Sequence, residues 1–303
     1  MKLLKILTLS TALIGMSACS AFDSQTNTET NTKTANIEKD NKFLTSVQLW
    51  GVRKDLKKDF KGTLEKLADM GFDGVEFAKE FGPYKKDPQG LKDYLDSIGL
   101  KASGAHLGFK PFRNEFFKTV AFYKTLGVDT IIIPMDKRSF DPLQFAEFTA
   151  ELNDLAKRLA KYGLKTGYHN HWQEFEPYKN ATYWDHIGND TTENVVMQLD
   201  IGWVTYSEKD SVDFIEKFPG RTFTTHLKPK FAKSYEDKAE ANGHYAIIGR
   251  DNFDWKSVLQ AQKSVGGTKW FVVEQEEYPL GMTPLEAVEA SKKGFDEIMA
   301  TLN

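Results

Sequence analysis

Four residues whose side chains bind divalent metals follow four apolar stretches of this chain. They are His169, Asp200, His226 and Glu274. An ionisable side chain at the end of an apolar stretch is costly to bury unless it is paired or bound to a metal. Two imidazoles and two carboxylates form a mixed nitrogen and oxygen set, which suits Mn, Co, Zn, Fe or Mg. We therefore expect these four residues to hold one divalent metal ion, and the choice among these metals stays open.

Further polar residues near the same stretch ends are candidates for proton transfer. His171 stands two positions after His169, so the alternation of side chains along a strand would place both on one side. We expect the catalytic residues to be Glu274, His171, Glu174 and Lys228. Each of the four has an alternative role. Glu274 could be a metal ligand only, and His171 and Glu174 could orient a metal ligand. Lys228 could stabilise an oxyanion or could be a solvated cation without a role in the reaction.

Two polar and three aromatic residues near the ends of the apolar stretches are candidates for substrate binding. We expect Glu76 and His106 to bind substrate hydroxyl groups rather than metal. Trp50, Trp172 and Trp203 are placed where the apolar face of a bound substrate would stack, although aromatic side chains also pack protein interiors.

The elements that must position these residues follow a regular alternation from Phe43 onward. Short apolar or β-branched stretches alternate with longer amphipathic ones, which is typical of βα units and a parallel sheet. The expected strands are 44–50, 72–77, 101–107, 130–135, 165–171, 195–201, 223–228 and 270–275. The expected helices are 60–70, 91–98, 116–126, 143–162, 255–264 and 285–302.

Glycines mark the ends of four expected helices. Gly71, Gly99, Gly127 and Gly163 stand where a helix is followed by a strand, a position that favours a left-handed residue. Eight strands within residues 43–303 predict an α/β fold, a (β/α)8 TIM barrel. Such barrels carry their active sites at the C-terminal ends of the strands, where the candidate residues above are found.

The first 42 residues have a different character. A short positive start, a brief apolar run and the sequence Met16-Ser17-Ala18 precede Cys19, which is typical of a secretory signal too short to remain in a bilayer. This ending resembles the lipobox of bacterial lipoproteins, in which the cysteine is lipidated. We expect a lipoprotein signal peptide at 1–18, a lipid anchor on Cys19 and a flexible tether at 19–42. The protein would then be exported and membrane-anchored, on the periplasmic side or the cell surface; the alternative is an ordinary signal peptide.

Composition excludes some partners. The formal net charge is −3 and basic residues are mixed with acidic ones, so we expect no nucleic acid partner. Cys19 is the single cysteine of the chain, which rules out an intrachain disulfide.

Five motifs resemble the sugar phosphate isomerase/epimerase family of xylose isomerase-like barrels. They are Gly74-Val75-Glu76-Phe77, Tyr168-His169-Asn170-His171, Gln198-Leu199-Asp200-Ile201-Gly202, His226-Leu227-Lys228 and Val273-Glu274-Gln275. The resemblance implies a divalent metal held by one residue from each of strands five to eight. It also implies proton abstraction next to a carbonyl, on a sugar or keto-sugar substrate.

Three positions depart from that family's pattern. His169 stands where many epimerases have glutamate, Trp203 where they have histidine, and Pro229 where members often have aspartate. Two metal-bound glutamates acting on opposite faces of one carbon are therefore missing. We expect an isomerase or epimerase first. The alternatives are a lyase or hydratase acting on 3-keto-glycosides or keto-sugars, and a non-catalytic sugar-binding lipoprotein.

The lipid anchor yields a first prediction. Cys19→Ala removes the thiol to which lipid would be attached, so the variant should no longer associate with membranes. Detergent-phase partitioning of both proteins in the native host measures this. Unchanged partitioning of the variant would contradict the lipoprotein interpretation.

Overall fold

The structure is a computed structural model that describes residues 43–302. The predictions of a signal peptide at 1–18, a lipid anchor on Cys19 and a tether at 19–42 lie outside these residues.

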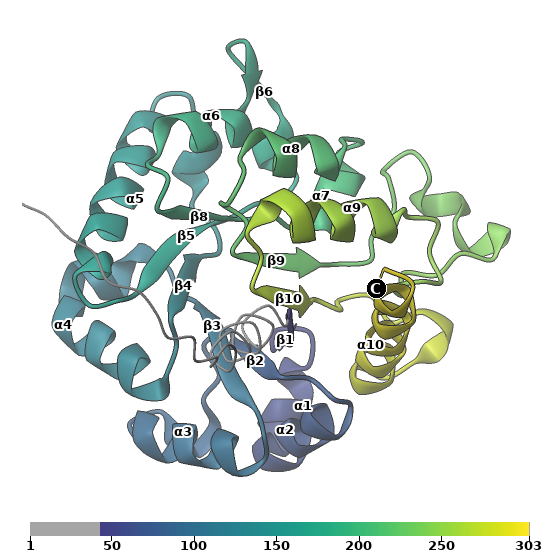
Figure 1. Cartoon of the computed structure of the whole chain (residues 1–303), viewed down its shortest axis with the longest axis horizontal. Helices are drawn as coiled ribbons and strands as arrows, with labels where there is room; N and C mark the ends of the chain where they lie inside the picture. The colour runs from purple at the N-terminus through teal and green to yellow at the C-terminus, as the bar shows by residue number, and fades with distance from the viewer. Residues whose placement is uncertain (1–42, 303) are drawn as a thin grey trace, which may run out of the picture. The chain divides into compact units, whose positions relative to one another are not determined.

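Eight parallel strands form one sheet in the described part of the chain (Figure 1). Their order is β8-β5-β4-β3-β2-β1-β10-β9. Their bounds are β1 (Leu44–Gln48), β2 (Gly74–Phe77), β3 (Lys101–His106), β4 (Thr130–Ile133), β5 (Lys165–His169), β8 (Val195–Gln198), β9 (Thr224–Leu227) and β10 (Trp270–Val273). A parallel bridge between Asp200 and His226 brings the two outer strands together, so the sheet is a nearly closed barrel. The predicted (β/α)8 barrel is confirmed.

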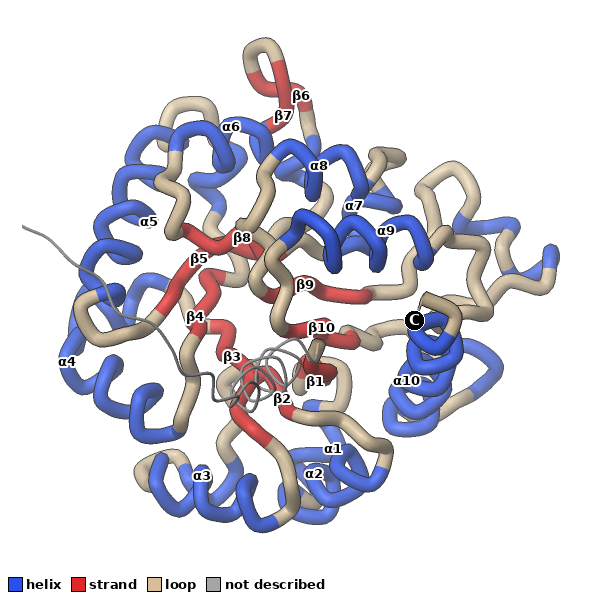
Figure 2. The backbone as a smooth tube through the Cα atoms, viewed as in Figure 1, coloured by secondary structure: helices blue, strands red, loops and turns tan. Residues whose placement is uncertain are grey.

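Helices surround the barrel (Figure 2). They are α1 (Arg53–Lys58), α2 (Phe60–Asp69), α3 (Pro88–Ser97), α4 (Phe109–Leu126), α5 (Phe145–Ala160), α6 (Tyr183–Asp190), α7 (Ile201–Tyr206), α8 (Ser211–Lys217), α9 (Trp255–Ala261) and α10 (Pro284–Ala300). Among residues 43–302, none of the helices is both long enough and apolar enough to cross a membrane.

The helix ends follow local sequence signals. The four predicted glycines all adopt left-handed backbone, with φ between 73° and 89°. Two of the short helices that sequence reasoning missed, α6 and α7, begin at side-chain caps. Asp200 accepts a hydrogen bond from the backbone N–H of Trp203 at the start of α7, and Thr182 forms a capping box with Asp185 at the start of α6.

Several predicted strands extend past the observed ones. Strands β1, β5 and β10 end at Gln48, His169 and Val273, two residues before the predicted ends. The chain turns there, because the residues beyond each strand end form the site. Helix α4 begins at Phe109, earlier than predicted, and Glu115 within it has non-helical backbone that marks a kink.

Polar side chains fill part of the barrel interior. Glu76 of β2 accepts hydrogen bonds from Gln48 Nε2 of β1 at 2.6 Å and from Gln198 Nε2 of β8 at 2.8 Å. Strands β2 and β8 are not neighbours in the sheet, so these side chains meet inside the barrel. Ser46 and Ser103 form another such contact, with 2.6 Å between their hydroxyl oxygens. Buried polar groups are stable only when hydrogen-bonded, so this network must form together with the barrel.

Candidate active site

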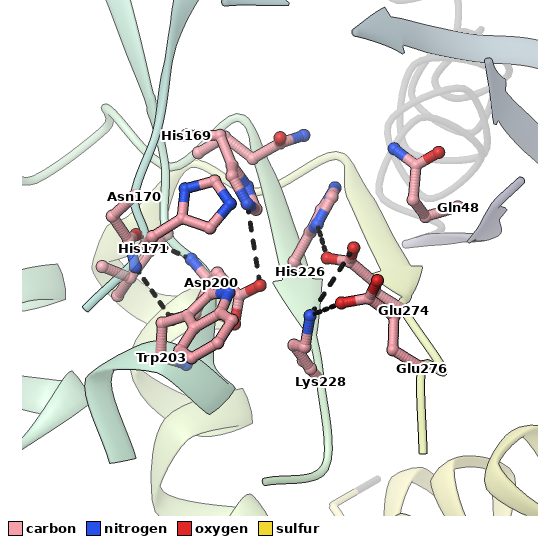
Figure 3. A network of polar contacts seen from close by, with 12 residues as sticks. Gln48, His169, Asn170, His171, Asp200, Trp203, His226, Lys228, Glu274 and Glu276 are labelled. Atoms are coloured by element: carbon pink, nitrogen blue, oxygen red, sulfur yellow. Dashed lines mark hydrogen bonds and ion pairs between the residues drawn. The ribbon is translucent and has the colours of Figure 1, made fainter. Parts of the chain in front are cut away.

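The four predicted metal ligands meet at the C-terminal end of the barrel (Figure 3). His169 ends β5, Asp200 follows β8, His226 lies in β9, and Glu274 directly follows β10. All four are buried, and each offers one ligand atom within 4.8 Å of the others. A second group, His106, His169 and His226, meets the same distance limit.

Two atoms of this cluster show that the residues fit a cation. Asp200 Oδ2 and His169 Nδ1 are buried and have no hydrogen-bond partner among residues 43–302. The nearest pairing, between His169 Nε2 and Asp200 Oδ2, is 3.7 Å long. A buried carboxylate oxygen without a partner is costly, whereas a bound cation would satisfy it. His169, Asp200, His226 and Glu274 could therefore hold a divalent ion.

His226 lies between two carboxylates. Its Nδ1 is 2.6 Å from Glu274 Oε2, and its Nε2 is 2.7 Å from Glu76 Oε2. Burial lowers the pKa of His226, but the charges of Glu76 and Glu274 outweigh burial and raise this pKa to about 10. A carboxylate behind a metal-binding imidazole fixes the orientation of the ring, and Glu76 is in that place.

Glu76 does not line the cavity as the sequence led us to expect. It is buried inside β2, one residue before the strand ends, and its carboxylate is held by Gln48, Gln198 and His226. A side chain inside the strand lies deeper in the barrel than one that follows the strand end. We therefore replace the expected contact with a substrate hydroxyl by a contact with His226.

A cavity of about 270 Å³ opens beside the metal cluster. It is lined by Trp50, Ala78, Lys79, His106, Pro134, Met135, His169, His171, Glu274 and Glu276. His106 and Trp50 are thus placed where a substrate would contact them. His106 Nε2 is also 2.7 Å from Gln198 Oε1, so its ring is connected to the polar network inside the barrel.

The other two predicted tryptophans lie outside this cavity wall. Trp203 packs against two residues of the site. The centroid of its ring is 5.8 Å from that of His171 and 5.0 Å from Lys228 Nζ. Trp172 is 40% exposed and lines a separate hollow together with Tyr206 and Lys233. The side chain of Trp172 therefore does not line the cavity that the neighbouring His171 lines.

Lys228 is buried rather than solvated. Its ammonium contacts Glu276 and lies 3.7 Å from Glu274 Oε1. Burial lowers the pKa of Lys228, but these carboxylates raise it well above its usual range. Burial also raises the pKa of Glu274, but the charges of Lys228 and His226 lower it well below its usual range. Glu274 is therefore ionised at neutral pH.

Glu174 holds the backbone of the site. One carboxylate oxygen accepts from Ser139 Oγ and from Tyr168 OH, both at 2.8 Å, and the other accepts from the backbone N–H of His171 at 2.8 Å. Both oxygens are thus in use within a buried network, away from the cavity wall. Of its two expected roles, the geometry favours orientation of His171 over proton transfer.

His171 lines the cavity as a neutral imidazole. Burial lowers its pKa to about 4. Its Nδ1 is buried and has no hydrogen-bond partner among the described residues. A neutral imidazole in the cavity wall is able to accept a proton from a bound substrate.

Comparison with known proteins identifies the family. The sequence profile of the xylose isomerase-like TIM barrel family matches residues 64–299, more than half of the chain. The chain belongs to this family.

Several relatives of this xylose isomerase-like barrel are known. Inosose dehydratase from Lacticaseibacillus casei is 23% identical over 272 residues, covering 79% of this chain and 90% of that protein. Inosose dehydratase from Salmonella agona is 25% identical over 272 residues, covering 79% and 89%.

Solved structures share the fold. A sugar phosphate isomerase/epimerase from Parabacteroides distasonis has a TM-score of 0.69 at 22% identity, covering 83% of this chain and 94% of that chain. An L-ribulose 3-epimerase has a TM-score of 0.62 at 13% identity, covering 86% and 95%. The resemblance to xylose isomerase-like barrels noted in the sequence is confirmed.

Sequence reasoning missed several residues of this barrel's site. Gln48 and Gln198 support Glu76, while Asn170 pairs with the backbone of Asp200 through hydrogen bonds of 2.9 and 3.2 Å. Glu276 and the cavity-lining Lys79 were also overlooked. Gln198 carried a usable signal, because it is an amide at the end of an otherwise apolar strand. Gln48 did not, because its strand also contains Thr45 and Ser46.

Replacing His226 tests the ligand set. His226→Ala removes one of four ligands, so metal affinity should fall steeply and activity should be lost with it. Glu76→Gln keeps the ligands and should weaken metal binding by roughly 10- to 100-fold. Metal content after dialysis measures both, and His186→Ala, at a half-buried histidine outside the cluster, is the matched control. Full stoichiometric metal in His226→Ala would show that the ligand set is wrong.

Metal binding should also release protons. Burial raises the pKa of Asp200 to about 8, and His226 has a pKa of about 10, so both carry a proton at pH 7 without metal. Ligands must be deprotonated to bind, so about two protons should leave at pH 7. Since Asp200 is already ionised at pH 9, the release should fall to about one there. Calorimetric titration in buffers of different ionisation enthalpy measures the release, and a release of no protons at pH 7 would contradict this electrostatic description.

Proposed function

We propose that the chain is a divalent-metal-dependent lyase that acts on a keto-sugar or a related ketone. It would remove the proton beside the carbonyl and expel the substituent of the next carbon. The observation that carries this proposal is the distribution of ionisable groups in the cavity wall. Both carboxylates of the wall, Glu274 and Glu276, follow β10, the imidazoles come from β3 and β5, and the residues after β1, β2 and β4 include neither group.

That distribution favours elimination over two-base epimerisation. Inverting a carbon requires one group to take a proton from one face and another group to return a proton to the opposite face. An elimination requires one base, a proton donor and room for a leaving group. The part of the wall formed by Trp50, Ala78, Pro134 and Met135 provides room, with Lys79 and His106 as its ionisable groups.

The residues of the cavity divide the chemistry among them. A divalent ion bound by the buried set would act as a Lewis acid on the carbonyl and its developing negative charge. Glu274, ionised and in the cavity wall, is the proposed base for the proton beside the carbonyl. His171 is the proposed second proton-transfer group, and Lys228 keeps Glu274 ionised.

The relatives support a lyase of this class. The two described above are both named inosose dehydratases, and each alignment covers 79% of this chain. A dehydratase removes water from its substrate, which is an elimination. Export to the cell envelope with a lipid anchor on Cys19 is part of the same proposal, because an exported enzyme meets glycosides more often than sugar phosphates.

An isomerase is the second candidate, and the sequence alone placed it first. Moving a proton between neighbouring carbons requires only one base, so Glu274 would also serve that reaction. The fold shared with a sugar phosphate isomerase/epimerase and an L-ribulose 3-epimerase is compatible with it. The intact ligand cluster argues against a non-catalytic sugar-binding lipoprotein.

Product analysis separates these functions. With methyl 3-keto-β-glucoside and the metal-loaded protein, a lyase should release methanol and leave an unsaturated ketone, whereas an isomerase should give a new keto-sugar that keeps its methyl group. His171→Ala should retain metal and lose about 100-fold or more in kcat. Glu174→Gln should lose less, because an amide can still accept the N–H of His171. Turnover without release of the aglycone would overturn the lyase proposal.

A further inference from the structure

The cavity wall formed after β1, β2 and β4 is mostly apolar. Trp50, Ala78, Pro134 and Met135 line it together with Lys79, and His106 comes from β3, the strand between β2 and β4. Trp50 and Met135 are each 45% exposed, although both are large hydrophobic side chains. Keeping such surface in water opposes folding, so these residues are better explained by contact with a ligand.

Trp50 is exposed but held in place. Its backbone N–H donates to Gln48 Oε1 at 3.3 Å, and its carbonyl accepts from Arg53 Nη1 at 2.7 Å. The Arg53 guanidinium also lies over the indole, 4.2 Å from the ring centroid. The ring is therefore a preorganised surface rather than a mobile side chain.

The turn after Trp50 is also fixed. The carbonyl of Gly51 accepts from Tyr278 OH at 2.7 Å. A Cβ added at Gly51 would lie 2.2 Å from the carbonyl oxygen of Gln275, so only glycine allows this close approach. The loop after β1 is thereby clamped against the chain that follows β10, where Glu274 lies.

Lys79 provides the one charge on this side. Its φ of 69° is left-handed, which is unusual for a residue other than glycine and is often found at functional sites. Among residues 43–302, no carboxylate lies within ion-pair distance of its ammonium. An apolar wall with one unpaired cation is complementary to an aromatic ring that carries one negative oxygen.

We propose that this side of the cavity binds an aromatic leaving group and that Lys79 stabilises its phenolate oxygen. The inference rests on the proposed lyase function. In an aryl 3-keto-glycoside, the C2–H bond breaks and Glu274 takes the proton, the C1–C2 double bond forms, and the C1–O bond breaks. The electron pair of that bond goes to the phenolic oxygen beside Lys79. The phenolate then takes a proton from solvent and leaves as the phenol, while Glu274 gives the proton it removed to solvent. Atoms and electrons balance without an oxidant or reductant.

Leaving groups of different basicity test the role of Lys79. Lys79→Met should lower kcat/KM by about tenfold or more for the phenyl 3-keto-β-glucoside. The loss should be much smaller for the 4-nitrophenyl compound, because its phenolate requires little stabilisation. A plot of rate against leaving-group basicity should therefore be steeper for the variant. An equal loss for both substrates would overturn the assignment of Lys79, because a merely structural role would affect both alike.

A comparison of aryl and methyl glycosides tests the apolar wall. Trp50→Ala should lower kcat/KM for the phenyl substrate about tenfold more than for the methyl substrate. Phe117→Ala removes an aromatic side chain that is 73% exposed on α4 and should change neither. Equal losses on both substrates in Trp50→Ala would overturn the aromatic subsite.

Binding separates this inference from the lyase proposal. Protein freed of metal with a chelator cannot turn over, yet it should bind the phenyl 3-keto-glucoside about tenfold more tightly than the methyl compound in a fluorescence titration. Equal binding, or no binding of the phenyl compound, would overturn the subsite whatever the turnover. Tight phenyl binding without release of either aglycone by the metal-loaded enzyme would instead overturn the lyase function alone.

Discussion

The placement of one imidazole between two carboxylates is the constraint on which the site depends. His226 of β9 reaches Glu76 on β2 with one nitrogen and Glu274, after β10, with the other. Three strands must therefore be in register before the ring has both partners. In a low-dielectric interior, an imidazole with one partner missing would leave a carboxylate uncompensated, which is costly. The polar contacts inside the barrel thus specify its geometry as well as its chemistry.

The same arrangement explains why the sequence revealed the ligands more easily than their supports. His169, Asp200 and Glu274 stand at or just after strand ends, His226 lies one residue before the end of β9, and parallel strands bring their C-terminal ends to one face of the barrel. The ends of the apolar stretches are enough to find such residues. Glu76 has the same place in β2 that His226 has in β9, so position along the strand does not separate a ligand from its support. That difference depends on which side chains the barrel register brings together, which no local pattern records.

Aromatic residues were harder to place for a related reason. Trp50 and Trp172 both follow strand ends, and their sequence neighbourhoods give no sign that one faces the cavity and the other a separate hollow. That difference arises from the loops, which are fixed by distant contacts such as Tyr278 with Gly51. The short helix α7 was missed because its six residues are stabilised mainly by the side chain of Asp200, a residue that we had considered only as a ligand.

The direction of β1 has a consequence for how the protein meets its surroundings. The strand begins at Leu44 and runs toward Trp50 in the cavity wall, so the described chain enters the barrel at the end opposite the cavity. Phe43 and Leu44 therefore lie at the N-terminal ends of the strands, and the cavity lies at their C-terminal ends. An attachment made directly at Phe43 would be at the end of the barrel opposite the cavity. Immobilisation through that end is accordingly compatible with bulky glycosides as well as small sugars.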